Sequence, residues 1–171
     1  MSKFLLICIE SPLKKSDHMY IETFLKKIYN INSDIKLKFL SLNGIDNYNK
    51  DNTLKRINSE INASMHSEKH IIYCLDTDNY NSPEYEKRNK SIQEFCNVHN
   101  YELVWFCKNI EEVFLGKSIS KSEKLQEARK FVIGIKNYTI DEQKLLQDKI
   151  KNKMSNFLLI FDKYLSRKNF L

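Results

Sequence analysis

Two carboxylates follow a short apolar stretch near the middle of the chain. Residues 71–75 read Ile-Ile-Tyr-Cys-Leu, and Asp76 and Asp78 come directly after them. A short apolar run between polar residues is typical of a buried strand, and ligands bind at the carboxyl ends of strands in open α/β sheets. Two carboxylates at that position repel each other unless a cation such as Mg²⁺ binds them. The alternative is structural, with Asp76 ending the strand and Asp78 opening a polar turn.

The N-terminus has the same pattern with one carboxylate. Residues 4–9 read Phe-Leu-Leu-Ile-Cys-Ile, and Glu10 follows them. If this strand lies beside the one that ends at Asp76, then Glu10, Asp76 and Asp78 project from adjacent strand ends. Three carboxylates at one edge would form a site for a hard cation.

Apolar runs that alternate with helical stripes should position these side chains. We expect strands at residues 3–10, 35–42, 70–76 and 101–107, and helices at 17–29, 51–66, 84–98 and 110–115. Asp17 is the expected N-cap of the first helix. This order predicts an α/β, Rossmann-like fold with a mostly parallel four-stranded sheet flanked by helices. Alternating apolar and Lys residues place the strand at 35–42 toward an edge.

Beyond residue 115 the pattern becomes helical. Residues 121–133 and 139–166 predict two more helices, so we expect an α/β core over residues 1–115 and a helical C-terminal portion over residues 116–171. The apolar face of the last helix either packs on the core or forms a dimer interface.

The motifs together resemble those of a Toprim domain, a fold found in topoisomerases, primases and several nucleases. The resemblance is carried by a Glu after the first strand, a helix, and Asp-x-Asp after the third strand. Tyr20-Ile-Glu-Thr-Phe24 and Lys108-Asn-Ile-Glu111 are similar to elements of the OLD and RloB-like branch of phage-defence and mobile-element proteins. The resemblance covers roughly the first two-thirds of the chain. In one departure, Ser11 and Pro12 stand where the family has a Gly after the first-strand Glu.

The resemblance implies a Mg²⁺- or Mn²⁺-dependent nuclease, or a related phosphoryl-transfer enzyme, that acts on DNA or RNA in phage defence or a mobile element. Glu10 would be the general acid or base and a metal ligand, and Asp76 and Asp78 would hold the metal. Lys108 would assist as a charge near the phosphate, although it is equally explained as an exposed strand-end lysine. Glu111 would be a second-metal ligand, although acidic residues also suit the start of a helix. A partner ATPase or a second copy of the chain are further implied partners.

Two other functions stay open. A catalytically inactive Toprim-like binding module for a protein or nucleic-acid partner would account for Ser11 and Pro12. A Rossmann-like domain for a small ligand is the third reading, but the first loop lacks the Gly-rich sequence that a dinucleotide requires.

Composition favours an anionic partner. The 28 basic and 22 acidic residues give a net charge of +6, which suits nucleic acid. We expect no spanning helix, because no apolar run approaches about 18 residues. The four cysteines have no Cys-x-x-Cys pairing and the N-terminus lacks a signal-peptide pattern, so we expect a cytoplasmic protein.

Overall fold

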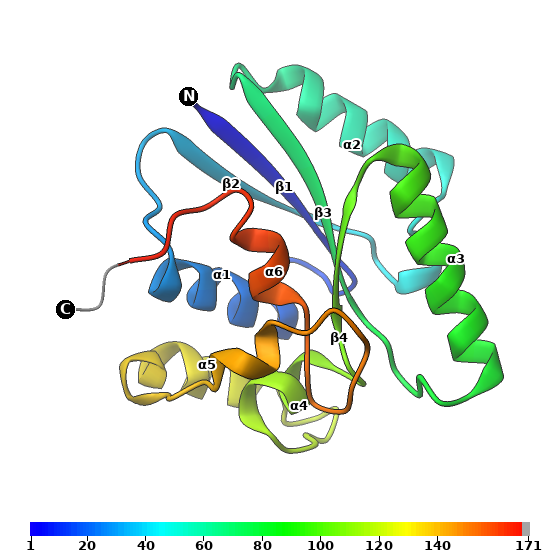
Figure 1. Cartoon of the computed structure of the whole chain (residues 1–171), viewed down its shortest axis with the longest axis vertical. Helices are drawn as coiled ribbons and strands as arrows, with labels where there is room; N and C mark the ends of the chain where they lie inside the picture. The colour runs from blue at the N-terminus through cyan, green and yellow to red at the C-terminus, as the bar shows by residue number, and fades with distance from the viewer. Residues whose placement is uncertain (169–171) are drawn as a thin grey trace.

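The computed structural model describes residues 1–168 and is built around one parallel sheet (Figure 1). Its strands are β1 (Lys3–Ile9), β2 (Ile35–Ser41), β3 (Glu68–Asp76) and β4 (Glu102–Phe106), in the order β2-β1-β3-β4. Every neighbouring pair is parallel. The predicted α/β Rossmann-like fold class is confirmed, as are the edge position of the second strand and the contact between the first and third strands.

Helices cover both faces of the sheet. One face carries α1 (Ser16–Ile28), α4 (Ile110–Leu115), α5 (Lys124–Gly134) and α6 (Phe157–Phe161), and the other carries α2 (Asp51–Ala63) and α3 (Pro83–His99) (Figure 1). Short 3-10 turns occur at Ile45–Asn47, Ile135–Asn137 and Glu142–Leu145. Side chains alternate along β1, so that Leu5 and Ile7 pack toward α1 whereas Leu6 and Cys8 pack toward α2. Because both faces are buried, this strand is apolar from Phe4 to Ile9.

The turn between β1 and α1 differs from the expectation at one residue. Lys15, not Asp17, is the N-cap of α1. Asp17 lies in the first helical turn, where its carboxylate accepts hydrogen bonds from the Ser11 N–H at 3.3 Å and the Ser16 hydroxyl at 3.1 Å. The backbone of Ser11 is not in the left-handed region, so this turn does not require the Gly of the Toprim pattern.

The predicted helix over residues 139–166 is wrong. Between the 3-10 turn at Glu142–Leu145 and α6 the chain is irregular, and Lys153 adopts a left-handed conformation. The apolar residues that suggested a long helical face, including Leu145, Phe157 and Phe161, are buried in the α1-side core from separate short elements. Apolar residues therefore recur about every four positions here although the segment is not a continuous helix.

The irregular segment covers the outer edge of β4. The Cys107 N–H donates to the Met154 carbonyl at 2.9 Å. The Asn156 side chain accepts from the Trp105 N–H at 2.9 Å and donates to the Leu103 carbonyl at 2.8 Å. These contacts satisfy backbone groups that an uncovered edge strand would leave unpaired, and tertiary contacts of this kind override a helical pattern.

The C-terminal portion belongs to the same core as the sheet. Ala128 and Phe131 of α5 and Leu158 of α6 are buried in the cluster that also contains Phe24 of α1 and Phe106 of β4. Within residues 1–168, no helix combines the length and the apolar character needed to cross a bilayer.

Candidate functional site at the carboxyl end of the sheet

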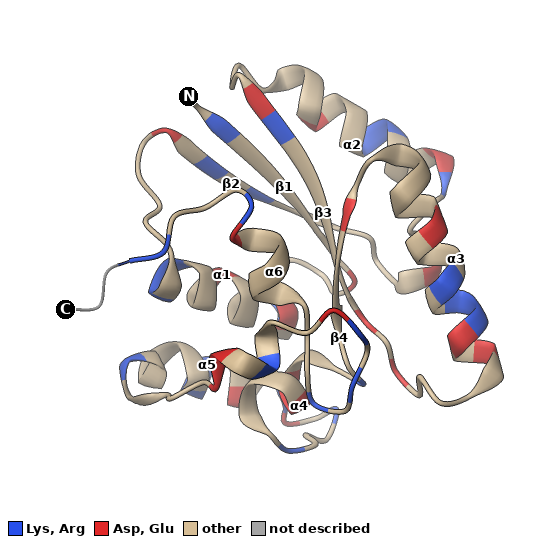
Figure 2. Cartoon of the chain, in the orientation of Figure 1, with Lys and Arg blue, Asp and Glu red and all other residues tan. Residues whose placement is uncertain are grey.

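β1 and β3 are neighbours in the sheet and end side by side. The chain continues from β1 to β2 on one side of this pair and from β3 to β4 on the other. The register pairs Ile9 with Cys74, so Glu10 and Asp76 leave the sheet at the same edge. This is the topological switch point at which open α/β sheets bind ligands. Figure 2 shows acidic segments at the end of β3 and in the loop that follows it. We call Glu10, Asp17, Asp76, Asp78 and Glu111 the acidic rim.

Asp76 lies at the end of β3, near three other carboxylates of the acidic rim. Its Oδ1 accepts a hydrogen bond from the Ile110 N–H at 3.0 Å, which ties the end of β3 to the first residue of α4. Burial raises the pKa of Asp76 well above its usual range, and repulsion from Asp17, Glu111 and Glu10 raises it further. Asp76 therefore has the structural contact expected of a strand end and also lies among other carboxylates.

Glu111 is a buried carboxylate with one charged partner. Its side chain is fully buried, and the Lys124 Nζ lies 3.1 Å from its Oε2. Within residues 1–168, Lys124 is the only ion-pair partner of Glu111. Burial raises the pKa of Glu111 although Lys124 opposes the shift.

Glu10 lies between two groups of charges. Burial, followed by repulsion from Asp78 and Asp17, raises its pKa to about 7, whereas Arg88 and Lys124 act in the opposite direction. A carboxyl group with this pKa is about half protonated at neutral pH, which suits a group that exchanges protons.

Asp78 is directed to the α3 side of the edge. Its backbone is left-handed, with φ of 51°, so the chain turns immediately after Thr77. Its Oδ2 accepts a hydrogen bond from Arg88 Nη1 at 2.9 Å, and Arg88 Nη2 donates to the Asp76 carbonyl at 3.4 Å. The carboxylates that most strongly raise the pKa of Asp76 are Asp17, Glu111 and Glu10 rather than Asp78. The structure therefore places the two aspartates in different surroundings, with Glu10 coupled to both.

Some residues in or next to the acidic rim have buried polar atoms without partners. Within residues 1–168, six buried side-chain atoms have no hydrogen-bond partner, and five of them belong to Ser11, Tyr20, Arg88 and Glu111. Burial and the nearby Glu111 raise the pKa of the Tyr20 hydroxyl. Such atoms are rare in folded proteins, and each needs a partner such as water or an ion.

The carboxylates of the acidic rim are of the type that binds a hard divalent cation, but they do not lie close enough together to form a metal site. Across residues 1–168, no three Asp, Glu, His or Cys side chains are placed closely enough to hold a metal ion. The rim nevertheless consists of carboxylates, which Mg²⁺ and Mn²⁺ prefer. Two of the expected ligands already have counter-ions, Lys124 for Glu111 and Arg88 for Asp78.

Lys108 reaches the rim through its backbone rather than its side chain. Its carbonyl accepts from the Asp78 N–H at 2.8 Å, and its N–H donates to the Thr77 hydroxyl at 3.0 Å. The side chain is 46% exposed, and its Nζ lies 3.9 Å from the Glu112 carboxylate. Lys108 is therefore available to an incoming anion without being part of the acidic rim.

Sequence reasoning missed three residues of the site: Asp17, Arg88 and Lys124. Asp17 was assigned only a capping role. Arg88 lies in the second turn of α3, and a basic residue near the start of the helix that follows Asp78 was a detectable signal. No sequence signal identified Lys124, because its position depends on the path of residues 116–123.

No protein-family model and no curated protein matches this chain. Among solved structures, the chain is similar to a de novo designed Rossmann fold protein, at 14% sequence identity and a TM-score of 0.32, over 77% of this chain and 98% of that one. The fold class stated above rests on the sheet order and strand directions of this structure.

Proposed function

We propose that the acidic rim binds Mg²⁺ or Mn²⁺ and that the protein is a metal-dependent nuclease, or a related phosphoryl-transfer enzyme, acting on nucleic acid. The observation that carries the proposal is the placement of Glu10 and Asp76 at the same edge of the sheet, with Asp76 bonded to the start of α4 and Glu111 buried on that helix. Like charges held together in a partly buried place are stabilised by a bound cation.

The residues have distinct roles in this proposal. Glu10, Asp76 and Glu111 would hold the cation, with Asp78 as a further ligand if it leaves Arg88. When bound, the cation would neutralise negative charge on the phosphodiester oxygens. Glu10 would hold or release the proton at the reacting oxygen, because its pKa lies near neutrality. Arg88 and the exposed Lys108 would contact phosphate groups.

Charge and motif order support nucleic acid as the substrate. The net charge of +6 favours a polyanion. The Toprim-like order of Glu10, Asp76 and Asp78 supports phosphodiester chemistry, and a role in phage defence or a mobile element enters only through that resemblance. A partner ATPase and a homodimer stay predictions on the same ground.

A second candidate, a catalytically inactive binding module, is favoured by the two ion pairs. Asp78 with Arg88 and Glu111 with Lys124 already neutralise two of the expected metal ligands. A module without chemistry would keep these pairs and bind its partner without a metal.

The deciding experiment is cleavage of end-labelled single- and double-stranded DNA and RNA with Mg²⁺, with Mn²⁺ or with EDTA. We expect cleavage only with metal, and Glu10→Gln should slow it by roughly 10²–10⁴-fold, the usual contribution of general acid–base catalysis. Glu94→Gln, which changes an exposed carboxylate on α3, is the matched control and should cleave like wild type.

Two outcomes would contradict the enzyme proposal. Equal cleavage by wild type and Glu10→Gln would assign the activity to something other than this site. Binding of nucleic acid without metal-dependent cleavage would support the binding module instead.

A further inference from the structure

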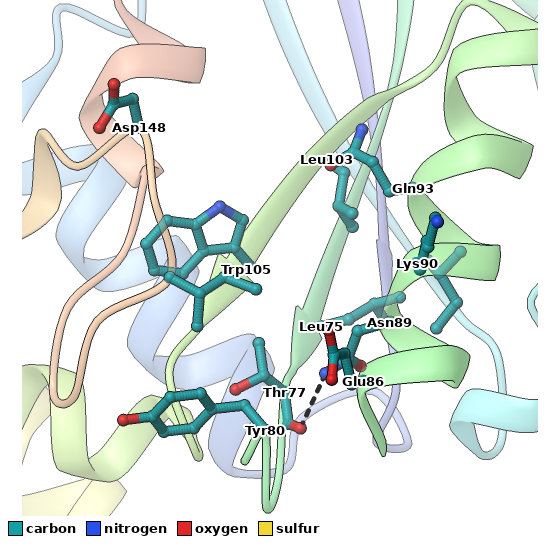
Figure 3. Close-up of a pocket in the computed structure, with 12 residues that line it drawn as sticks. Leu75, Thr77, Tyr80, Glu86, Asn89, Lys90, Gln93, Leu103, Trp105 and Asp148 are labelled. Carbon is teal, nitrogen blue, oxygen red and sulfur yellow. Dashed lines mark hydrogen bonds between the residues drawn. The ribbon is translucent and has the colours of Figure 1, made fainter. Parts of the chain in front are cut away.

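A pocket of about 490 Å³ lies beside the acidic rim, between β4 and α3 (Figure 3). Its volume is within the range of small-ligand sites. Leu75 and Thr77, which flank Asp76 in the sequence, face this pocket. Because successive strand residues point to opposite faces, the pocket and Asp76 lie on opposite faces of the same strand end.

Two aromatic side chains line one side of the pocket. Trp105 comes from β4 and Tyr80 from the loop after β3, and both lie across the pocket from α3 in Figure 3. Trp105 is 7% exposed, and Leu75 and Leu103 beside it are also buried. The part of the indole that lines the pocket suits a flat, uncharged ring, because stacking and apolar burial act together there.

The opposite wall supplies polar groups from one face of α3. Asn89 and Gln93 are one helical turn apart, and Lys90 lies beside them. The Asn89 amide is held in place, since it donates to the Thr77 carbonyl at 3.1 Å and accepts from Arg88 at 3.2 Å. The Gln93 amide nitrogen donates to Asn97 at 2.9 Å, which leaves its carbonyl oxygen to accept from a ligand.

The charged side chains around the pocket favour binding of a nucleobase over binding of a phosphate group. Glu86, Asp148 and Lys90 line it and all three are exposed, so the lining holds one more carboxylate than ammonium group. Carboxylates repel phosphate but accept hydrogen bonds from ring or exocyclic amino groups. An uncharged planar heterocycle with donors and acceptors on its edge therefore matches the pocket.

Arg88 connects the pocket to the acidic rim. It donates to Asp78, to the Asp76 carbonyl and to the Asn89 side chain, so one guanidinium contacts both places. A nucleotide with its base in the pocket would have its phosphate directed toward Arg88.

We propose that this pocket binds an unpaired nucleobase, stacked on Trp105, from the strand whose phosphate lies at the acidic rim. This inference rests on the proposed function and narrows its substrate to single-stranded nucleic acid, or to a duplex with a base turned out of the stack. A base inside an intact duplex is already stacked on its neighbours and is unavailable to Trp105.

Trp105 is the only tryptophan of the chain, so intrinsic tryptophan fluorescence reports on this pocket alone. The titration is performed on Glu10→Gln with Mg²⁺, so that the cation is present and cleavage is slow, and uses a short single-stranded oligonucleotide, its duplex, nucleoside monophosphates and inorganic phosphate. We expect saturable quenching by the single strand, weaker binding of the monophosphates, and no quenching by the duplex or by phosphate. Monophosphates that bind as tightly as the single strand would assign the pocket to a free nucleotide and overturn the strand as the source of the base.

Two substitutions separate stacking from folding. By anisotropy of a labelled single strand, Trp105→Leu should weaken binding by about tenfold, whereas Trp105→Phe keeps an aromatic face and should bind close to wild type. Thermal melts of both variants check that they are folded. A single strand that binds without changing Trp105 fluorescence, or that does not bind, would overturn the pocket proposal. Metal-dependent cleavage that is undiminished in Trp105→Leu would also overturn it and leave the acidic rim proposal standing.

Discussion

At the scale of single residues, the acidic rim is a set of charges that the fold holds against their mutual repulsion. The pKa values of Glu10, Asp76 and Glu111 are all raised, with burial as the largest cause in each case. Lys124 opposes each of these shifts and acts as an internal counter-ion. Perturbed carboxylates that share an edge of the sheet are more typical of a functional site than of ordinary surface ion pairs.

Because the pKa of Glu10 is raised, the free energy of unfolding should decrease as the pH rises. The folded protein keeps this proton up to a pKa of about 7, whereas an unperturbed Glu releases it at about 4.5. Wild type therefore loses stability between these two pH values, because the unfolded state binds fewer protons there. Glu10→Gln cannot ionise, so it should melt above wild type at pH 8, with a gain that shrinks as the pH is lowered to 5.

Thermal melts of both proteins across this pH range, without metal, measure the effect. Glu94→Gln serves as the control and should follow wild type at every pH. A Glu10→Gln gain that does not vary with pH would show that Glu10 does not titrate with a raised pKa.

At the scale of elements, the outer edge of β4 depends on the segment that replaced the expected helix. Asn156 is 9% exposed and pairs two backbone groups of β4 through its side chain. Ser155 adds a third contact, from its hydroxyl to the Trp105 carbonyl at 2.6 Å. The segment therefore also holds the strand that carries the tryptophan of the pocket.

Asn156→Ala should lower the free energy of unfolding by about 2–4 kcal/mol, because it leaves the Trp105 N–H and the Leu103 carbonyl without partners. Urea unfolding measures the change. Asn152→Ala, an exposed position four residues earlier, should change stability by less than about 0.5 kcal/mol. Equal effects of the two substitutions would mean that Asn156 does not hold the edge.

The elements that sequence predicted well are those with strong local patterns. The four strands and α3 follow from apolar runs and turn residues, and Glu10 and Asp76 meet because the strand order places β1 beside β3. The prediction of a helix over 139–166 was wrong because part of this segment pairs with the outer edge of β4. That pairing is a tertiary contact, which the local sequence pattern does not show. Lys124 was missed for the same reason, since a contact across the fold places it at the rim. Arg88 had a local signal, a basic residue near the start of the helix after Asp78.

At the scale of the whole molecule, the positive charge is spread rather than gathered. Figure 2 shows Lys and Arg over most elements, with acidic residues interspersed. A net charge of +6 still attracts a polyanion over distances of about a Debye length. Long-range charge then brings nucleic acid to the molecule, while the acidic rim and the pocket determine what is bound there.

Affinity for single-stranded nucleic acid should fall steeply between low and physiological salt, because bound cations are released when Lys and Arg contact phosphates. Anisotropy titrations at several salt concentrations, in EDTA, measure the slope. Affinity that does not change with salt would indicate a protein or small-molecule partner instead.

Cation binding at the acidic rim is the central claim, and thermal unfolding of wild type and Asp76→Asn with EDTA or Mg²⁺ tests it most directly. The substituted amide keeps an oxygen that can accept from the Ile110 N–H but removes the charge that Asp17, Glu111 and Glu10 repel. Without metal, Asp76→Asn should therefore melt above wild type. With Mg²⁺ at about 100 times its Kd, wild type should gain roughly 5–10 °C and Asp76→Asn much less. If Asp76→Asn melts below wild type without metal and wild type gains nothing from Mg²⁺, the carboxylates are structural and the rim does not bind a cation.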